Sequence, residues 1–194
     1  NAFQMDHTLS ISGGTDKTTY YFSGGYNTQD GVAKSNSMNK LSLRTNIEHK
    51  MTDWLSLGGS ISVSQTKYAG LNTGANSLSG NIFNAMRQLP NTPIFSDRHP
   101  TGYNILGANV GQWDNTDPVG DNISNIGYVL ANNKFESSVK RVLANVFASV
   151  DIVKGLNYRI QMSADNPNTT GFLYYNPIHG DGQGSNGRLQ NSTD

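Results

Sequence analysis

Apolar and polar residues alternate with a period of two along several stretches of the chain, which is typical of β-strands with one apolar face. In the clearest stretch, residues 55–66, Leu, Ile and Val occupy most odd positions and Ser occupies most even positions. Such alternation indicates an all-β chain of up-and-down antiparallel strands. Six stretches carry the pattern: residues 7–14, 18–29, 38–50, 55–66, 136–152 and 156–165.

The links between these stretches alternate between short and long. The short links lie near residues 15–17, 51–53 and 153–155, and the long ones near 31–37, across 69–134, and from Pro167 to the end. Outer-membrane barrels have tight turns on the periplasmic side and longer loops outside. Strands of roughly 10–15 residues also exceed the usual length of about five or six. The pattern therefore favours an arc of a large transmembrane barrel.

The segment 69–134 is too long for a passive connection, and we expect it to be an outward loop with one short helix. The residues on one face of that helix precede Pro90, which ends it: Leu78, Ile82, Phe83, Met86 and Leu89. We expect the polar run 180–194 to contain no closing strand.

Aromatic residues fall toward the ends of the predicted strands. Tyr20, Trp54 and Tyr158 lie near the short turns, and Tyr26 and Tyr68 near the long loops. Two such girdles border the apolar band of a membrane barrel. The alternative is an ordinary half-buried antiparallel sheet in a soluble protein.

Composition narrows the possible classes. The 194 residues include 14 basic and 14 acidic side chains. The chain therefore has no excess of positive charge that would favour binding to nucleic acid. The chain has no Cys, which excludes disulfides and thiolate metal sites. No apolar run approaches the roughly 20 residues of a membrane helix. Without a signal peptide or a closing strand, we expect an internal piece of a longer protein.

No motif indicates catalysis or a cofactor. The four His residues lack metal-ligand spacing, and no G-x-S-x-G elbow occurs. Residues 13–18 read better as a tight turn than as a phosphate loop. Residues 181–187, and separately Asp114, Asp117 and Asp121, are weak calcium candidates. We expect no enzyme, no cofactor and no resident metal.

Several short motifs follow one another along the chain: LSISGGTDKTTYY at 9–21, GY at 25–26, QDG at 29–31, LRTN at 43–46, MRQLPNTP at 86–93 and KGLNYR at 154–159. In this order they resemble the early barrel region of SusC/RagA-type TonB-dependent outer-membrane transporters. The chain departs from the family pattern at 97–99, where Asp-Gly is common, and at 117–118, where Asn-Pro is common.

The resemblance implies that residues 1–194 form an arc of about six strands in a plugged barrel of about 22 strands, without the plug domain. It implies an energised importer of oligosaccharides or peptides in a Gram-negative outer membrane, of the Bacteroidetes type. The implied partners are a SusD-like lipoprotein, TonB acting through parts outside this chain, outer-membrane lipid, and the glycan or peptide ligand.

The polar strand faces supply candidate residues for a solute path. Two loop aromatics, Tyr103 and Trp113, are candidates for contact with the lipoprotein or for sugar stacking, although both fit equally well as loop-core residues. The lumen candidates are Arg44, Glu48, Asn145, Ser149, Asp151, Arg159 and Gln161.

Two other functions compete with transport. A soluble extracellular β-sandwich that binds glycans requires a second sheet packed on the face of Leu55, Ile61 and Val63. An outer-membrane enzyme barrel requires a nucleophile or metal set that the sequence does not reveal.

Overall fold

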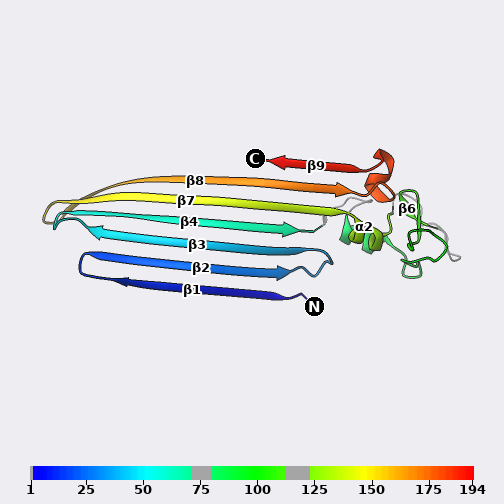
Figure 1. Ribbon diagram of the computed structural model, residues 1–194, viewed down its shortest axis with the longest axis horizontal. Helices are drawn as coiled ribbons and strands as arrows, with labels where there is room; N and C mark the ends of the chain where they lie inside the picture. Colours follow the sequence, from blue (N-terminus) through cyan, green and yellow to red (C-terminus); the bar gives the residue numbers. More distant parts are fainter. Residues whose placement is uncertain (1, 71–79, 112–122) are drawn as a thin grey trace.

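The computed structural model describes residues 2–70, 80–111 and 123–194. It contains a long antiparallel sheet of seven strands in the order β1-β2-β3-β4-β7-β8-β9 (Figure 1). β1 and β9 each pair with one strand of this sheet, so the sheet is open. The predicted up-and-down arrangement of strands in an arc is confirmed. The strands are β1 (Gln4–Gly14), β2 (Thr18–Asp30), β3 (Ser37–Lys50), β4 (Leu55–Ala69), β7 (Lys134–Val153), β8 (Leu156–Tyr175) and β9 (Arg188–Thr193).

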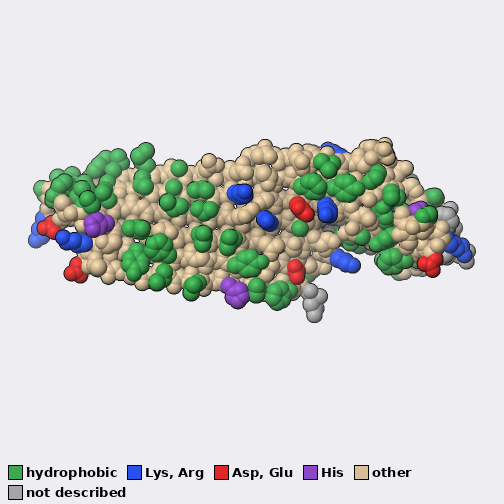
Figure 2. All heavy atoms as spheres, viewed as in Figure 1, with side chains coloured by type: hydrophobic (Ala, Val, Ile, Leu, Met, Phe, Trp, Pro, Cys, Tyr) green, Lys and Arg blue, Asp and Glu red, His purple; other side chains and the backbone are tan. Residues whose placement is uncertain are grey.

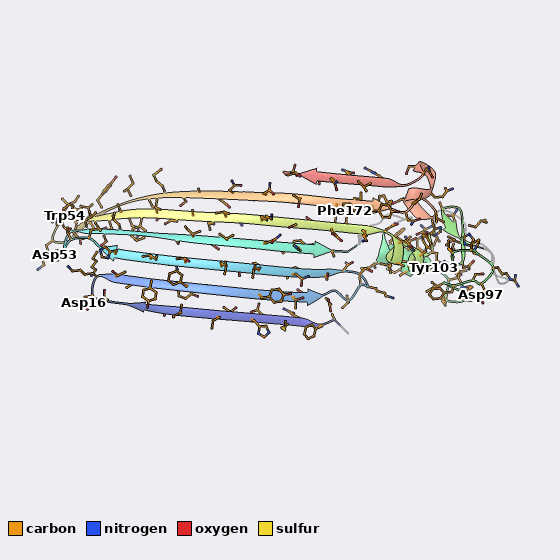
Figure 3. The ribbon with its side chains drawn as sticks, in the orientation of Figure 1. Asp16, Asp53, Trp54, Asp97, Tyr103 and Phe172 are labelled. Atoms are coloured by element: carbon orange, nitrogen blue, oxygen red, sulfur yellow. The ribbon has the colours of Figure 1, made fainter. Side chains whose placement is uncertain are left out.

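The two ends of the sheet differ as the sequence predicts. Short turns at 15–17, 51–54 and 154–155 gather at one end, and the links 31–36, 70–133 and 176–187 gather at the other. Asp16, Asp53 and Trp54 mark the short-turn end in Figure 3, and Asp97 and Tyr103 mark the loop end.

The C-terminal part of the prediction is wrong. β8 continues through Pro167 to Tyr175, and β9 follows where no strand was expected, which gives seven strands in place of about six. β7 begins at Lys134 and pairs with β8 from Tyr174 downward, and the end of β8 then pairs with β9. The polar composition of these segments is typical of loops. They form strands because backbone pairing with the neighbouring strand outweighs their local preference.

One face of the sheet is apolar and uncovered. Paired residues in an antiparallel ladder point to the same side, and one such row joins Phe22, Thr45 and Ile61 across β2, β3 and β4. Val142 and Val146 lie on this face and are 44% and 59% exposed. Figure 2 shows apolar side chains spread over the strands. In the described part of the chain, no second sheet packs against them.

The aromatic residues divide between the two faces. Tyr20, Tyr26 and Tyr158 share the apolar face with Ile47, Leu41 and Val150, their ladder partners. Tyr68 pairs with Met38 on the opposite face, so its predicted place in an outward girdle is wrong. One position along a strand is enough to reverse the side, because side chains alternate.

The link between β4 and β7 carries most of the remaining structure. The predicted helix is present as α1 (Asn81–Arg87), although it is shorter than predicted, and Leu78 lies outside the described residues. A second helix, α2 (Ile126–Asn132), was not predicted. β5 (Ile105–Leu106) pairs with β6 (Asn109–Val110), and the 3₁₀ turn η1 (Gly180–Ser185) precedes β9. None of the helices in residues 2–70, 80–111 and 123–194 has the length and apolar composition needed to cross a membrane.

The buried core lies in the loops and not between sheets. Ile105, Val110, Ile123, Tyr128 and Val129 are each at most 3% exposed. We name residues 80–111, 123–133 and 176–187 the loop module. It folds on itself around these residues.

Candidate functional site

All predicted lumen residues lie on the face opposite the apolar one. Asn145, for example, pairs with Ser60 and Ser163, whereas its neighbours Ala144 and Val146 pair with apolar-face positions. The ladder register carries the same side across four strands. The residues that share this polar face are Arg44, Glu48, Asn145, Ser149, Asp151, Arg159 and Gln161.

A hollow of about 330 Å³ lies on the polar face toward the short-turn end. Four of the candidates, Arg44, Glu48, Asn145 and Arg159, line it together with Phe147. The guanidinium carbon of Arg159 lies 3.6 Å from the centre of the Phe147 ring. A cation over an aromatic face is attracted by the ring quadrupole, so this pair forms a flat, cationic platform in the hollow.

Phe147 is a site residue that sequence reasoning missed. Its ring covers Gly58 of β4, where an added Cβ would lie 2.4 Å from a ring carbon. Only the polar residues of this face were selected from the sequence. The available signal was an aromatic residue between Asn145 and Ser149 on the polar side of β7, and its ladder partner is Gly58.

The rest of the polar face carries paired hydroxyl, amide and charged groups. The Asn157 side-chain amide donates to Ser149 and to Asp151, both at 2.9 Å. Farther along β7, Arg141 binds Asp165 through two hydrogen bonds in an exposed ion pair. These groups offer many donors and acceptors to a polar solute and no single deep site.

The described residues bring together no group of metal ligands. No three of their His, Asp or Glu side chains come together as a metal site would require. Asp181 lies in η1, and the second calcium candidate, at positions 114–121, lies outside the described residues.

His179 is the central residue of the loop module and is fully buried. Its Nε2 accepts the backbone N–H of Asn125 at 2.7 Å, and its Nδ1 donates to the carbonyl of Gly107 at 2.8 Å. Burial lowers the pKa of His179 from its ordinary 6.5 to about 4. The neutral ring therefore joins the β8–β9 loop to the β4–β7 loop.

Asn125 organises the partner loop around the same point. Its side-chain oxygen accepts the N–H of Tyr128 at 3.2 Å and so caps α2. Its side-chain amide donates to the carbonyls of Ile94 at 2.7 Å and Asn104 at 3.0 Å. One buried side chain thus fixes the start of α2 against two other segments.

The aromatic candidate Tyr103 belongs to a row of rings. Its ring centre lies 5.1 Å from Phe95 on one side and 5.1 Å from Tyr128 on the other, and Tyr128 meets His179 at 5.4 Å. Burial, chiefly, raises the pKa of Tyr128. Tyr103 is half-buried, whereas Phe95 is 65% exposed. Trp113 lies outside the described residues.

The loop module also exposes large apolar side chains. Met86 is 81% exposed, and Ile82 and Leu89 are 46% and 49% exposed. We name these three residues and Phe95 the loop patch. Large exposed apolar side chains that gather on one surface mark interaction sites.

Comparisons with known proteins agree with this architecture. No protein-family model matches the chain. It is 26% identical over 166 residues to the TonB-dependent receptor P3 of Formosa agariphila, covering 83% of this chain and 15% of the relative. The solved structure of the RagAB peptide importer in its "closed-closed" state matches with a TM-score of 0.60 and 24% identity.

That alignment covers 89% of this chain and 19% of the importer chain, so the chain spans less than a fifth of either protein's length. The names of both describe a receptor or an importer and not an enzyme. The resemblance predicted from the sequence motifs is confirmed: the chain is similar to a TonB-dependent receptor, and its fold matches a segment of the RagAB importer.

Proposed function

We propose that residues 1–194 form one arc of the wall of an energised outer-membrane importer. One observation carries this proposal: the sheet has an uncovered apolar face and a polar face, and all its long loops lie at one end. A barrel wall needs apolar groups toward lipid and polar groups toward the lumen. In this orientation the short turns face the periplasm and the loop module faces outside.

The polar face forms part of the solute path. Its candidates, such as Arg44, Glu48 and Gln161, make dispersed, weak contacts with a passing ligand. The Arg159 guanidinium, held over the Phe147 ring, adds a flat and positively charged surface. A planar or negatively charged group of the ligand can contact this surface. Dispersed contacts suit transport, because a ligand must leave the site as well as enter it.

The loop patch meets a SusD-like lipoprotein lid. Its exposed apolar residues, led by Met86 and Phe95, supply the desolvated centre of such an interface. Tyr103 acts behind them by supporting the Phe95 ring, and we keep Trp113 as a contact candidate. The similar RagAB structure is that of a peptide importer, which supports peptides as the ligand over oligosaccharides.

TonB drives import through parts of the protein outside this chain. The proposal is tested with the full-length transporter in cells, by uptake of a fluorescent oligopeptide and of a matched oligosaccharide. We expect peptide uptake that a proton uncoupler abolishes, and at least a several-fold loss on replacing Met86 and Phe95 by Ser. Replacing Val32, an apolar residue of the 31–36 link that is 96% exposed, is the control and should change nothing. Peptide uptake that is unchanged in the presence of the uncoupler would contradict the proposal.

A further inference from the structure

The apolar band on the lipid side ends at one level across three neighbouring strands. On β4 the outward positions change from Val63 to Gln65, and on β7 they change from Val142 to Lys140. β8 makes the same change from Ala164 to Asn166. Val63 pairs with Val142, and Val142 pairs with Asn166. The change from apolar to polar outward positions therefore occurs at nearly the same height on all three strands. The strands nevertheless continue toward the loop end.

Two lysines lie just above this boundary and still face outward. Lys67 pairs with Ser138, and Lys140 pairs with Gln65, so the two lysines are diagonal neighbours on β4 and β7. Diagonal neighbours lie about 7–8 Å apart, a spacing that two flexible ammonium groups can close around one anion. Both side chains are exposed. Figure 2 shows two basic side chains side by side over the middle of the sheet toward the loop end.

A hollow lies on the same outward face, and Lys67 is part of its lining. It has a volume of about 620 Å³ and lies beside Phe172 at the loop end of β8 (Figure 3). Most of the side chains that line it are polar, and their amides and hydroxyls suit hydroxyl-rich ligands. The outward-facing residues that line it include Asn39, Lys67, Glu136, Ser138, Thr170 and Phe172.

The depth of the pair matches a lipid headgroup. With a rise of about 3.3 Å per residue and a tilt of about 40°, the backbone at Lys140, which is level with Gln65, stands about 5 Å above Val63. The backbone at Lys67 stands about 10 Å above Val63, from where its long side chain can reach back to the headgroups. The headgroup layer on each side of a bilayer is about 5–8 Å thick. Lysine at that level is attracted to anionic headgroups.

We propose that Lys67 and Lys140 bind a phosphate of a phosphorylated glycolipid in the outer leaflet, with the sugar in the adjacent hollow. The orientation rests on the proposed function, since the loop end must face outside. The pair offers two positive charges to one phosphate, and the amides and hydroxyls beside it fit sugar hydroxyls. Glu136, on the other diagonal from Lys67, opposes the phosphate and sets the edge of the site.

The test measures lipid binding to the full-length transporter in detergent by native mass spectrometry. The probes are lipid A, lipid A stripped of its phosphates, phosphatidylglycerol and inorganic phosphate. We expect lipid A to bind most tightly and the double variant Lys67→Gln/Lys140→Gln to bind it about 30-fold more weakly. Lys40→Gln is the matched control, because Lys40 lies at a similar level of β3 but on the polar face, and it should leave binding unchanged.

Further variants and probes test the charge and the ligand separately. Glu136→Gln should tighten lipid A binding several-fold, and each variant must keep the heat-modifiable mobility of the folded barrel. Equal affinities for the double variant and the unaltered protein would overturn the proposal. So would equal binding of lipid A and its stripped form, of phosphatidylglycerol and lipid A, or of inorganic phosphate and lipid A. Uptake by the same variants is measured separately, so failure of lipid binding and failure of import are distinguishable.

Discussion

At the scale of single residues, the buried ring of His179 holds two loops together. Its two nitrogens bind the backbone at Gly107 and Asn125, which lie 72 and 54 positions away in the sequence. A charged ring has no acceptor for the Asn125 N–H. The hydrogen bond from the Asn125 N–H to His179 therefore forms only when the ring is neutral. Burial keeps the ring neutral, because it disfavours the charged form.

This arrangement predicts that the stability of the loop module depends on pH. Because the pKa of His179 is about 4 in the fold and about 6.5 ordinarily, the unfolded loop binds more protons between these values. The contribution of the neutral ring, about 3 kcal/mol, is complete above pH 6.5 and is lost progressively as pH falls toward 4. His99 lies within electrostatic range and opposes protonation further.

Hydrogen exchange at the Asn125 amide measures this effect. We expect its protection factor, corrected for intrinsic exchange, to fall by one to two orders of magnitude from pH 7 to pH 4.5. The amide of Phe22 in the β2 ladder is the control and should keep its protection. An Asn125 amide equally protected at both pH values would rule out the neutral-ring bond.

At the scale of elements, the contact between β4 and β7 on the polar face depends on a missing side chain. The Phe147 ring occupies the space above Gly58, and the ring supports Arg159. Any Cβ at position 58 must displace the ring, because the two would overlap.

A double-mutant cycle tests this packing. We expect Gly58→Ala to destabilise the barrel by about 1–3 kcal/mol, and Phe147→Ala to remove most of that penalty when the two are combined. The measurement is the urea midpoint of the full-length barrel in lipid. Gly184→Ala, where an added Cβ meets open space, is the control. Additive effects of Gly58→Ala and Phe147→Ala would show that the ring does not occupy the space above Gly58.

The sequence predicts some elements better than others for physical reasons. β4 follows its alternation closely, since its apolar positions meet one environment along most of its length. The outer half of β8 and all of β9 lack that alternation, because they lie beyond the apolar band and their strand state depends on a neighbour. α2 did carry a local signal, with Asn125 as a cap and apolar residues at 126, 129 and 130. The Phe147–Gly58 contact and the role of His179 depend on distant pairing, which a single sequence does not reveal.

At the scale of the whole molecule, the chain places its core in the loop module and leaves the sheet without one. The apolar face of the sheet, including Ile61, Val142 and Val146, is largely exposed in the chain alone. An apolar face of this size would promote aggregation in water. In a membrane, lipid would cover the face without a partner protein. We therefore expect lipid to lie against this face.

The most direct measurement of that claim is a spin-label accessibility scan along β7. Single cysteines are placed at each position from 142 to 149 in a full-length transporter without other cysteines, reconstituted in lipid; residues 1–194 contribute none. We predict high oxygen accessibility at 142, 144, 146 and 148, and high accessibility to a water-soluble nickel complex at 143, 145, 147 and 149. Nickel accessibility without a period of two, or low oxygen accessibility at 142 and 146, would show that lipid does not cover this face.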